Sequence, residues 1–226
     1  FGYDINKNLH NLDINLVKLL NTYEINLFFD IGASVGYYGK NLIDKGYKGR
    51  IVSFEPIDES YKKLRSISDK YDTWDSENFA LGSNPGTSEI NISLNRSSSS
   101  FLPMTHSHLE AAPQSQYFKS EKVQIKRLDD IYSKFSDSNS ISFLKIDVQG
   151  YEKQVLEGSK ESLDKIKGLQ VELSLQETYE GSSTYDEITN FLLDLGFSLK
   201  FLAPVLTNQE SGQQLQIDAI FFRDTH

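Results

Sequence analysis

Cysteine is absent from the 226-residue sequence. The protein therefore forms no disulfide, has no thiolate nucleophile, and cannot bind an iron–sulfur cluster or a zinc ion through sulfur. Long apolar runs are absent too, because no segment approaches the roughly 20 residues that cross a bilayer. With no disulfides and no basic amino-terminal region followed by an apolar one, the sequence favours a soluble, cytoplasmic protein without a membrane span.

Positive charge is scarce. The chain has 23 Lys and Arg residues against 32 Asp and Glu residues, which gives a net charge of −9 and a pI near 5.0. Proteins that bind nucleic acid or anionic lipid through bulk charge need a cationic surface. We therefore expect no nucleic-acid partner.

The length and the hydrophobic content indicate one folded domain. Hydrophobic residues make up 38% of the chain, which is enough for a proper core. Single α/β domains often reach about 250 residues, so we expect residues 1–226 to form one domain. Position 1 is Phe, which leaves open a domain cut from a larger multidomain biosynthetic protein. Within the domain we expect a helical segment at 1–24 and a lid or acceptor insertion at 95–120.

Short apolar segments alternate with amphipathic ones along most of the chain. The predicted strands of the main sheet are residues 27–31, 50–54, 74–81, 141–148 and 169–175. The predicted helices are residues 37–45, 58–69, 151–163 and 185–195. This alternation is typical of an α/β fold whose mostly parallel sheet has helices on both faces. Residues 197–202 and 215–222 indicate an antiparallel hairpin at the end of the sheet. Residues 87–94 indicate an added strand with one solvent-exposed face.

A glycine-bearing loop, residues 30–36, joins the first strand to the next helix. Glycine lets the backbone turn tightly and approach a ligand, as in nucleotide-type sites at the carboxyl end of a parallel sheet. A turn that needs glycine for packing alone is the alternative. The dinucleotide fingerprint is incomplete, because Ser34 and Tyr37 occupy two of its glycine positions. The acid Asp30 disfavours phosphates and suits a ligand with an ammonium and a sulfonium, such as S-adenosylmethionine. The cofactor contacts expected here are Asp30, Gly32, Ala33, Ser34, Gly36 and Tyr38.

A second acid ends the second predicted strand. Glu55 follows Asp30 by 25 residues and can accept two hydrogen bonds from a ribose diol. Pro56 fixes the turn after it. The alternative for Glu55 is a solvated strand end, but together with the loop at Asp30 the ribose contact is favoured.

Four separated motifs carry a resemblance to a known family. They span residues 29–36, 53–56, 78–82 and 144–158, and a weaker one lies at 127–129. With these motifs, residues 27–222 resemble the FkbM-type S-adenosylmethionine-dependent methyltransferases. The resemblance implies a Rossmann-like, seven-stranded methyltransferase fold and methyl transfer to a hydroxyl oxygen. It further implies cofactor contacts from Pro56, Asn78, Ala80, Ser99, Ser100, Asp147 and Val148.

Two positions depart from the family pattern. Ser34 stands where the family usually has Asn, a small polar exchange that should leave cofactor binding intact. Gln149 stands where the family usually has Glu, which removes a negative charge at the end of the fourth strand. This exchange argues against a base or a metal ligand at Gln149, and we predict no metal site.

Methyl transfer needs an aligned acceptor oxygen and a group that takes its proton. Asp147 is the first candidate, because it ends a central strand where ligands bind in such sheets. Lys145 is a second candidate, whose alternative is an ion pair with Glu172. Glu172 could itself hold an acceptor hydroxyl. His106 is the fourth, since a neutral imidazole is a natural base, and its alternative is a solvated loop histidine.

The sequence therefore predicts an O-methyltransferase that uses S-adenosylmethionine. The expected acceptor is a small molecule or glycan, with a hydroxyl of a sugar or of a secondary metabolite of polyketide or peptide type. One alternative is an NAD(P)- or nucleotide-sugar-binding Rossmann enzyme. The other is a non-catalytic cofactor-binding module of a larger assembly.

Overall fold

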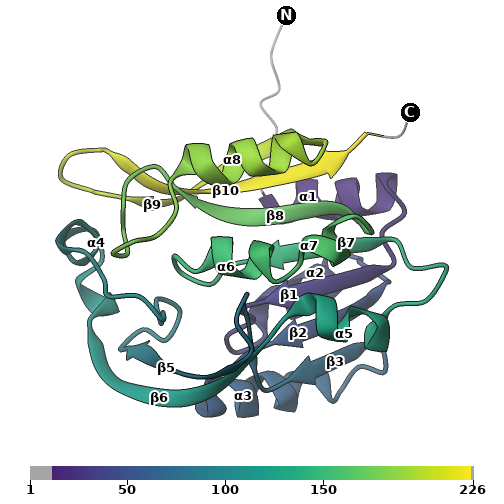
Figure 1. The fold of residues 1–226 in the computed structure, drawn as a ribbon, viewed down its shortest axis with the longest axis horizontal. Helices are drawn as coiled ribbons and strands as arrows, with labels where there is room; N and C mark the ends of the chain where they lie inside the picture. Colours follow the sequence, from purple (N-terminus) through teal and green to yellow (C-terminus); the bar gives the residue numbers. More distant parts are fainter. Residues whose placement is uncertain (1–11, 225–226) are drawn as a thin grey trace, which may run out of the picture.

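A computed structural model describes residues 12–224, which are built around a seven-stranded sheet (Figure 1). The strand order is β3-β2-β1-β7-β8-β10-β9. Strands β3, β2, β1, β7 and β8 run parallel, and β10 runs antiparallel to both β8 and β9. The strands are β1 (Leu27–Ile31), β2 (Arg50–Phe54), β3 (Trp74–Glu77), β7 (Ser142–Ile146), β8 (Ile166–Ser174), β9 (Phe197–Thr207) and β10 (Gln214–Arg223). The predicted mostly parallel sheet with an antiparallel carboxyl-terminal hairpin is confirmed.

Helices cover both faces of this sheet. Its inner strands are apolar on both sides, so alternate side chains pack in opposite directions. Phe28 and Phe143 pack with the first group of helices, whereas Phe29 and Leu144 pack with the second. The first group is α1 (Leu12–Thr22), α2 (Tyr37–Asp44) and α3 (Asp58–Ser68). The second group is α5 (Leu128–Phe135), α6 (Glu152–Glu157), α7 (Lys160–Leu163) and α8 (Tyr185–Asp194).

A smaller sheet of three strands extends away from the main one (Figure 1). Its order is β4-β6-β5, with β4 (Ala80–Leu81) parallel to β6 (Tyr117–Lys126) and β5 (Gly86–Ser93) antiparallel to it. The added strand expected at 87–94 is therefore β5, and β6 is the partner that satisfies its backbone hydrogen bonds.

Two predicted elements are interrupted in the structure. The strand expected at 74–81 divides into β3 and β4, because the Asn78 amide donates hydrogen bonds to the carbonyls of Glu55 and Pro56 and turns the chain. The helix expected at 151–163 divides into α6 and α7 at Gly158. A Cβ on Gly158 would lie 2.1 Å from the carbonyl oxygen of Gly82, so the close approach of these two loops accounts for the glycine.

Residues 95–120, the expected lid or acceptor insertion, are attached to the rest of the fold at several points. They contain α4 (His106–Ala111) and a 3-10 turn, Pro113–Ser115. Isolated bridges join Ser100 to Asn91 and Met104 to Tyr179. Of the helical segment predicted at 1–24, α1 is described, and residues 1–11 lie outside the described residues. The single-domain organisation and the role of residues 95–120 stay predictions.

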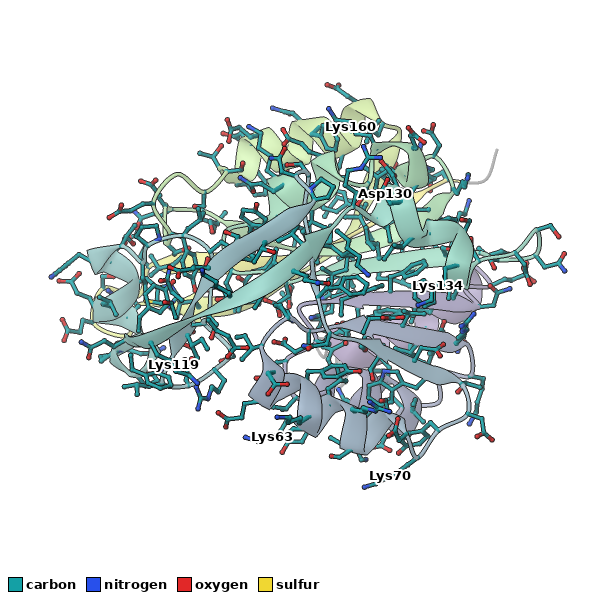
Figure 2. All side chains as sticks on the ribbon, turned by 60° about the horizontal axis from the view of Figure 1, so that its bottom comes forward. Lys63, Lys70, Lys119, Asp130, Lys134 and Lys160 are labelled. Carbon is teal, nitrogen blue, oxygen red and sulfur yellow. The ribbon has the colours of Figure 1, made fainter. Side chains whose placement is uncertain are left out.

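Two surface properties bear on the expected partners. No helix among residues 12–224 has the length and apolarity that a membrane crossing requires. In Figure 2, Lys63 and Lys119 lie at the lower left of the molecule, whereas Lys134 and Lys160 lie on other parts of it. The absence of a nucleic-acid partner and the cytoplasmic location remain predictions.

Candidate active site

Two neighbouring cavities open beside the loop after β7, and the loops after β1 and β2 also line the first of them. The first, called cavity A here, contains Glu55 in its wall. The second, cavity B, contains His108. Ser97, Asp147 and Gln149 line both cavities, so Asp147 stands at the boundary between them. Ligands of open α/β sheets bind at this carboxyl edge.

The structure separates the predicted cofactor contacts into two groups. Those that line cavity A are Gly32, Ser34, Glu55, Pro56, Ala80, Ser99, Asp147 and Val148. Those outside its wall are Asp30, Ala33, Gly36, Tyr38, Asn78 and Ser100. Several of the second group support the fold around the cavity instead. Asn78 turns the chain after β3, and the Ser100 hydroxyl donates a 2.6 Å hydrogen bond to the carbonyl of Gln149.

The loop after β1 needs its glycines for close contacts. A Cβ on Gly32 would lie 1.9 Å from the carbonyl oxygen of Asp147, and the φ angle of Gly32 is +80°. Gly36 has a φ angle of +86°, and a Cβ on Gly36 would lie 2.8 Å from the Leu64 side chain of α3. Gly32 thus lets the loop approach the end of β7 at cavity A, while Gly36 seats α2 against α3.

Glu55 presents a buried carboxyl group to cavity A. One oxygen accepts a hydrogen bond from the backbone N–H of Ser34 at 2.9 Å, and the other accepts one from the N–H of Ile57 at 2.8 Å. Burial raises the pKa of Glu55 to about 8, although the two N–H donors act in the opposite direction. Each oxygen keeps a further lone pair, so a ligand with two adjacent hydroxyl groups would complete the hydrogen bonding.

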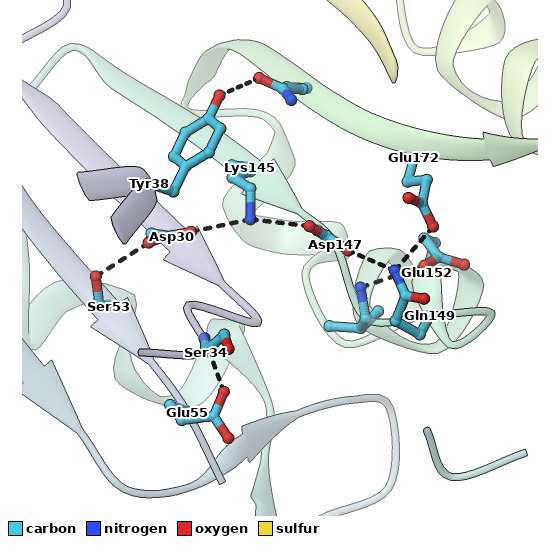
Figure 3. Close-up of polar contacts among 12 residues, drawn as sticks. Asp30, Ser34, Tyr38, Ser53, Glu55, Lys145, Asp147, Gln149, Glu152 and Glu172 are labelled. Carbon is cyan, nitrogen blue, oxygen red and sulfur yellow. Dashed lines mark hydrogen bonds and ion pairs between the residues drawn. The ribbon is translucent and has the colours of Figure 1, made fainter. Parts of the chain in front are cut away.

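A row of polar side chains crosses the sheet beneath α2 (Figure 3). The strand registers place Ser53, Asp30, Lys145 and Gln170 side by side on β2, β1, β7 and β8. The Ser53 hydroxyl donates to Asp30 at 3.2 Å, and the Lys145 ammonium lies 3.2 Å from the other Asp30 oxygen. The Tyr38 hydroxyl donates to Gln170, so Tyr38 closes this row instead of lining cavity A.

Lys145 joins this row to the cavities. Its ammonium lies 3.4 Å from Asp147 and 4.6 Å from the centre of the Tyr38 ring, and its side chain is only 4% exposed. Burial alone would lower the pKa of Lys145, but the charges of Asp30 and Asp147 outweigh burial and raise it. Lys145 therefore stays a cation and cannot act as a base. It pairs with Asp30 and Asp147 and not with Glu172, which was the alternative from the sequence.

Gln149 connects the carboxyl groups of Asp147 and Glu172 (Figure 3). Its amide nitrogen donates to Asp147 at 2.8 Å and to Glu172 at 3.0 Å, and its amide oxygen accepts from the Tyr179 hydroxyl at 2.7 Å. Burial and the nearby charge of Asp147 raise the pKa of Glu172 well above its ordinary value. The Gln149 amide thus donates N–H groups to both carboxyl groups, which a carboxylate at position 149 could not do. Among the described residues, no group of three or more His, Asp or Glu side chains is arranged to hold a metal ion.

The two histidines of α4 lie in opposite environments. His106 is exposed, pairs with Glu110 at 3.3 Å and lines neither cavity. His108 is 2% exposed, packs against the Tyr179 ring and lines cavity B. Burial lowers the pKa of His108 to about 4, so its ring is neutral at pH 7. The sequence shows no helical pattern over residues 106–111, so it does not distinguish the buried His108 from the exposed His106.

Comparison with known proteins decides the family. A model described as the methyltransferase FkbM domain matches residues 30–199. The chain belongs to the FkbM methyltransferase family. This membership confirms the resemblance drawn from the motifs and gives the NAD(P)- or nucleotide-sugar-binding alternative no support. Family and fold together indicate S-adenosylmethionine as the cofactor.

A curated relative and two solved structures are similar to this FkbM chain. The relative is the 2-O-methyltransferase NoeI of Sinorhizobium fredii, 26% identical over 74% of this chain and 70% of its own. Magnesium protoporphyrin IX methyltransferase of Synechocystis PCC 6803, solved with bound SAM, is 10% identical with a TM-score of 0.50 over 99% of this chain and 87% of its own. An rRNA methylase of Streptococcus thermophilus is also 10% identical, with a TM-score of 0.51 over 99% and 100% of the two chains. At these identities the structures support the methyltransferase fold alone.

The residues around cavity A fit S-adenosylmethionine chemically. Glu55 offers buried acceptors for a ribose diol, and Ile57, Ile90 and Phe101 supply apolar wall for an adenine ring. Arg96 also lines cavity A, and its Nη1 atom is buried without a hydrogen-bond partner among the described residues, so it suits the carboxylate of the methionine part.

Several of these wall residues were not predicted from the sequence. Ile57 could have been found, because it directly follows Glu55 and Pro56. Ile90 and Phe101 belong to the smaller sheet and to the segment after it, and their position at cavity A depends on how these pack. Gln216 and Leu206 of the carboxyl-terminal hairpin reach cavity B, and no sequence pattern marks them.

Proposed function

We propose that this FkbM-family protein is an O-methyltransferase that transfers a methyl group from S-adenosylmethionine to a hydroxyl of a sugar, a glycan or a secondary metabolite. The observation that supports this most is the shared wall of the cavities. Asp147 lies between a cavity whose groups suit the cofactor and one large enough for a second ligand. The relative named as a 2-O-methyltransferase supports oxygen as the methylated atom.

In this proposal cavity A binds the cofactor, with Glu55 on the ribose and Arg96 on the carboxylate. When bound, S-adenosylmethionine supplies an electrophilic methyl group on a sulfonium. Asp147 holds the acceptor hydroxyl at the boundary and takes its proton as the oxygen–carbon bond forms, while the electrons of the broken sulfur–carbon bond remain on sulfur. Lys145 and Gln149 act by positioning Asp147, since each contacts one of its carboxyl oxygens.

Calorimetric titration with S-adenosylhomocysteine tests the cofactor site. At about pH 9, above the pKa of Glu55, we expect wild-type protein to bind and Glu55→Ala to bind at least about tenfold more weakly, because a hydrogen bond to a charged group contributes roughly 1.5–3 kcal/mol. Glu89→Ala is the matched control, since Glu89 is an exposed glutamate of β5. Absence of binding by wild type, or equal binding by Glu55→Ala and Glu89→Ala, would overturn the proposed site.

Methyl transfer itself is tested by mass spectrometry. The protein is incubated with S-adenosylmethionine and with metabolite and glycan extracts of its source organism, and products that gain one methyl group are identified. Wild type should give an O-methylated product, and Asp147→Asn should give little. A product methylated at nitrogen or carbon, or cofactor binding without any product, would contradict O-methyl transfer. The second outcome would favour the non-catalytic cofactor-binding module.

A further inference from the structure

Cavity B has the composition of a site for an uncharged, hydrogen-bonding ligand. Its volume is about 260 Å³, slightly below the roughly 300–1,000 Å³ of pockets for drug-sized molecules. It is therefore large enough for one small ring. The uncharged polar side chains that line it include Asn95, Ser98, Gln114, Ser115 and Gln216. Of the described residues, those that line this cavity include no Lys, Arg, Phe, Tyr or Trp.

The polar groups of this wall are held in place. The Asn95 amide donates to the hydroxyls of Ser98 and Ser115 at 3.0 Å each. On the opposite side, the Gln216 amide donates to Glu172 at 2.7 Å. Fixed donors and acceptors of this kind recognise hydroxyl groups without having to rearrange.

His108 is a wall residue whose hydrogen bonding is incomplete. Both of its ring nitrogens are buried, and neither has a hydrogen-bond partner within the part of the chain that the structure describes. A buried polar atom without a partner is unfavourable, so a ligand hydroxyl that reaches the ring gains a hydrogen bond for which no described protein group competes. With its lowered pKa the ring is neutral and offers one N–H donor and one acceptor nitrogen, which suits a hydroxyl better than a carboxylate.

We propose that cavity B binds the methyl acceptor as a neutral, saturated, hydroxyl-rich ring, and that His108 hydrogen-bonds to this ring. The inference rests on the proposed function, because cavity B adjoins Asp147 and cavity A. A carboxylate or phosphate on the ring is disfavoured, since Asp147 lies in the wall and no described Lys or Arg lines it. An aromatic acceptor is also disfavoured, because the described wall has no Phe, Tyr or Trp ring to stack on it.

Saturation-transfer NMR on protein saturated with S-adenosylhomocysteine tests this assignment with three probes. These are methyl β-D-glucopyranoside, the same glycoside with its hydroxymethyl group oxidised to a carboxylate, and catechol. We expect saturation transfer from the protein to the neutral glycoside. The saturation transfer to the oxidised glycoside (the uronate) and to catechol should be at least about fivefold weaker. Equal or stronger transfer to the uronate or to catechol would overturn the ligand class, as would no transfer to the neutral glycoside.

Variants of the two α4 histidines test the residue. His108→Leu should abolish saturation transfer to the neutral glycoside, and His108→Gln should retain part of this signal. His106→Leu should leave the signal unchanged. Equal effects of the Leu variants, or undiminished transfer with His108→Leu, would refute the role of His108. Calorimetry with S-adenosylhomocysteine on the same samples separates the causes. Loss of cofactor binding by wild type would count against the proposed function, whereas a retained cofactor site with unchanged glycoside binding would refute the acceptor site alone.

Discussion

The buried ion pair between Lys145 and Asp30 can be tested by removing the cation. Lys145→Met replaces the ammonium with an apolar chain of similar length, so little new cavity arises. It leaves Asp30, which is fully buried, with the Ser53 hydroxyl at 3.2 Å as its remaining side-chain hydrogen bond among the described residues. A hydroxyl cannot balance a full charge in a site that water does not reach.

The expected loss follows from the burial of the pair. Removing one partner of a buried ion pair lowers the free energy of unfolding by about 3–5 kcal/mol. For a chain of this size, each kcal/mol corresponds to roughly 2–4 °C in the midpoint of thermal unfolding, so we expect a fall of about 6–20 °C. The double variant Asp30→Asn/Lys145→Met removes both charges and should recover most of this loss.

Urea and thermal unfolding followed by circular dichroism measure these differences. Lys40→Met is the control, because Lys40 forms an exposed ion pair with Asp44 within α2, and exposed pairs contribute little. If Lys145→Met unfolds at the same midpoint as Lys40→Met, or if the double variant is no more stable than the single one, the buried charge pair does not exist as described.

Two further predictions concern ligand binding and turnover. Because ribose hydroxyls donate best to an ionised carboxylate, the pKa of about 8 for Glu55 predicts that S-adenosylhomocysteine binds about fifty-fold more tightly at pH 8 than at pH 6. Calorimetry should show this rise in wild type and a flat profile in Glu55→Gln; the same slope in both would contradict the assignment. Gln149→Leu removes the donors to Asp147 and Glu172, so we expect kcat to fall about tenfold or more while the affinity for S-adenosylhomocysteine stays within about threefold. Equal losses of kcat and affinity would show that Gln149 supports cavity A instead.

The fold was largely predictable because its signals are local. Strands β1, β2 and β7 are short apolar runs followed directly by Gly32, Glu55 and Asp147, and the helices between them have clear apolar faces. Helix α5 was missed, since it begins at Leu128 within the weak motif at 127–129 and no capping side chain marks its start. The division of 74–81 and of 151–163 depends on contacts made by Asn78 and Gly158 with distant loops, which no local pattern reveals.

The site was predictable where its residues follow the strand ends directly. Glu55 and Asp147 occupy such positions, and both line cavity A. Asp30 instead lies within β1, one residue before its end, and its side chain points beneath α2 to Lys145, because alternate residues of a strand face opposite sides of the sheet. The sequence predicted that Asp30 contacts the ammonium of a cofactor. Only the register of β1 and β7, which places Asp30 beside Lys145, shows which way its side chain points. His108 was not among the predicted site residues, because only the packing of α4 on Tyr179 distinguishes it from His106.

The environment of Asp147 bears on how the proposed reaction is accelerated. One oxygen of Asp147 faces a cation that is fixed by burial, and the other accepts a hydrogen bond from an amide that is itself fixed by Tyr179. Both oxygens of Asp147 therefore have a fixed neighbour, which holds the carboxyl group in one place at the boundary of the two cavities. A sulfonium methyl group is already strongly electrophilic, and the proton of the acceptor need only leave as the bond forms. In the proposed reaction, alignment of the acceptor oxygen should therefore contribute much of the acceleration, and the uncharged Gln149 fits this role because its amide positions Asp147 by a hydrogen bond.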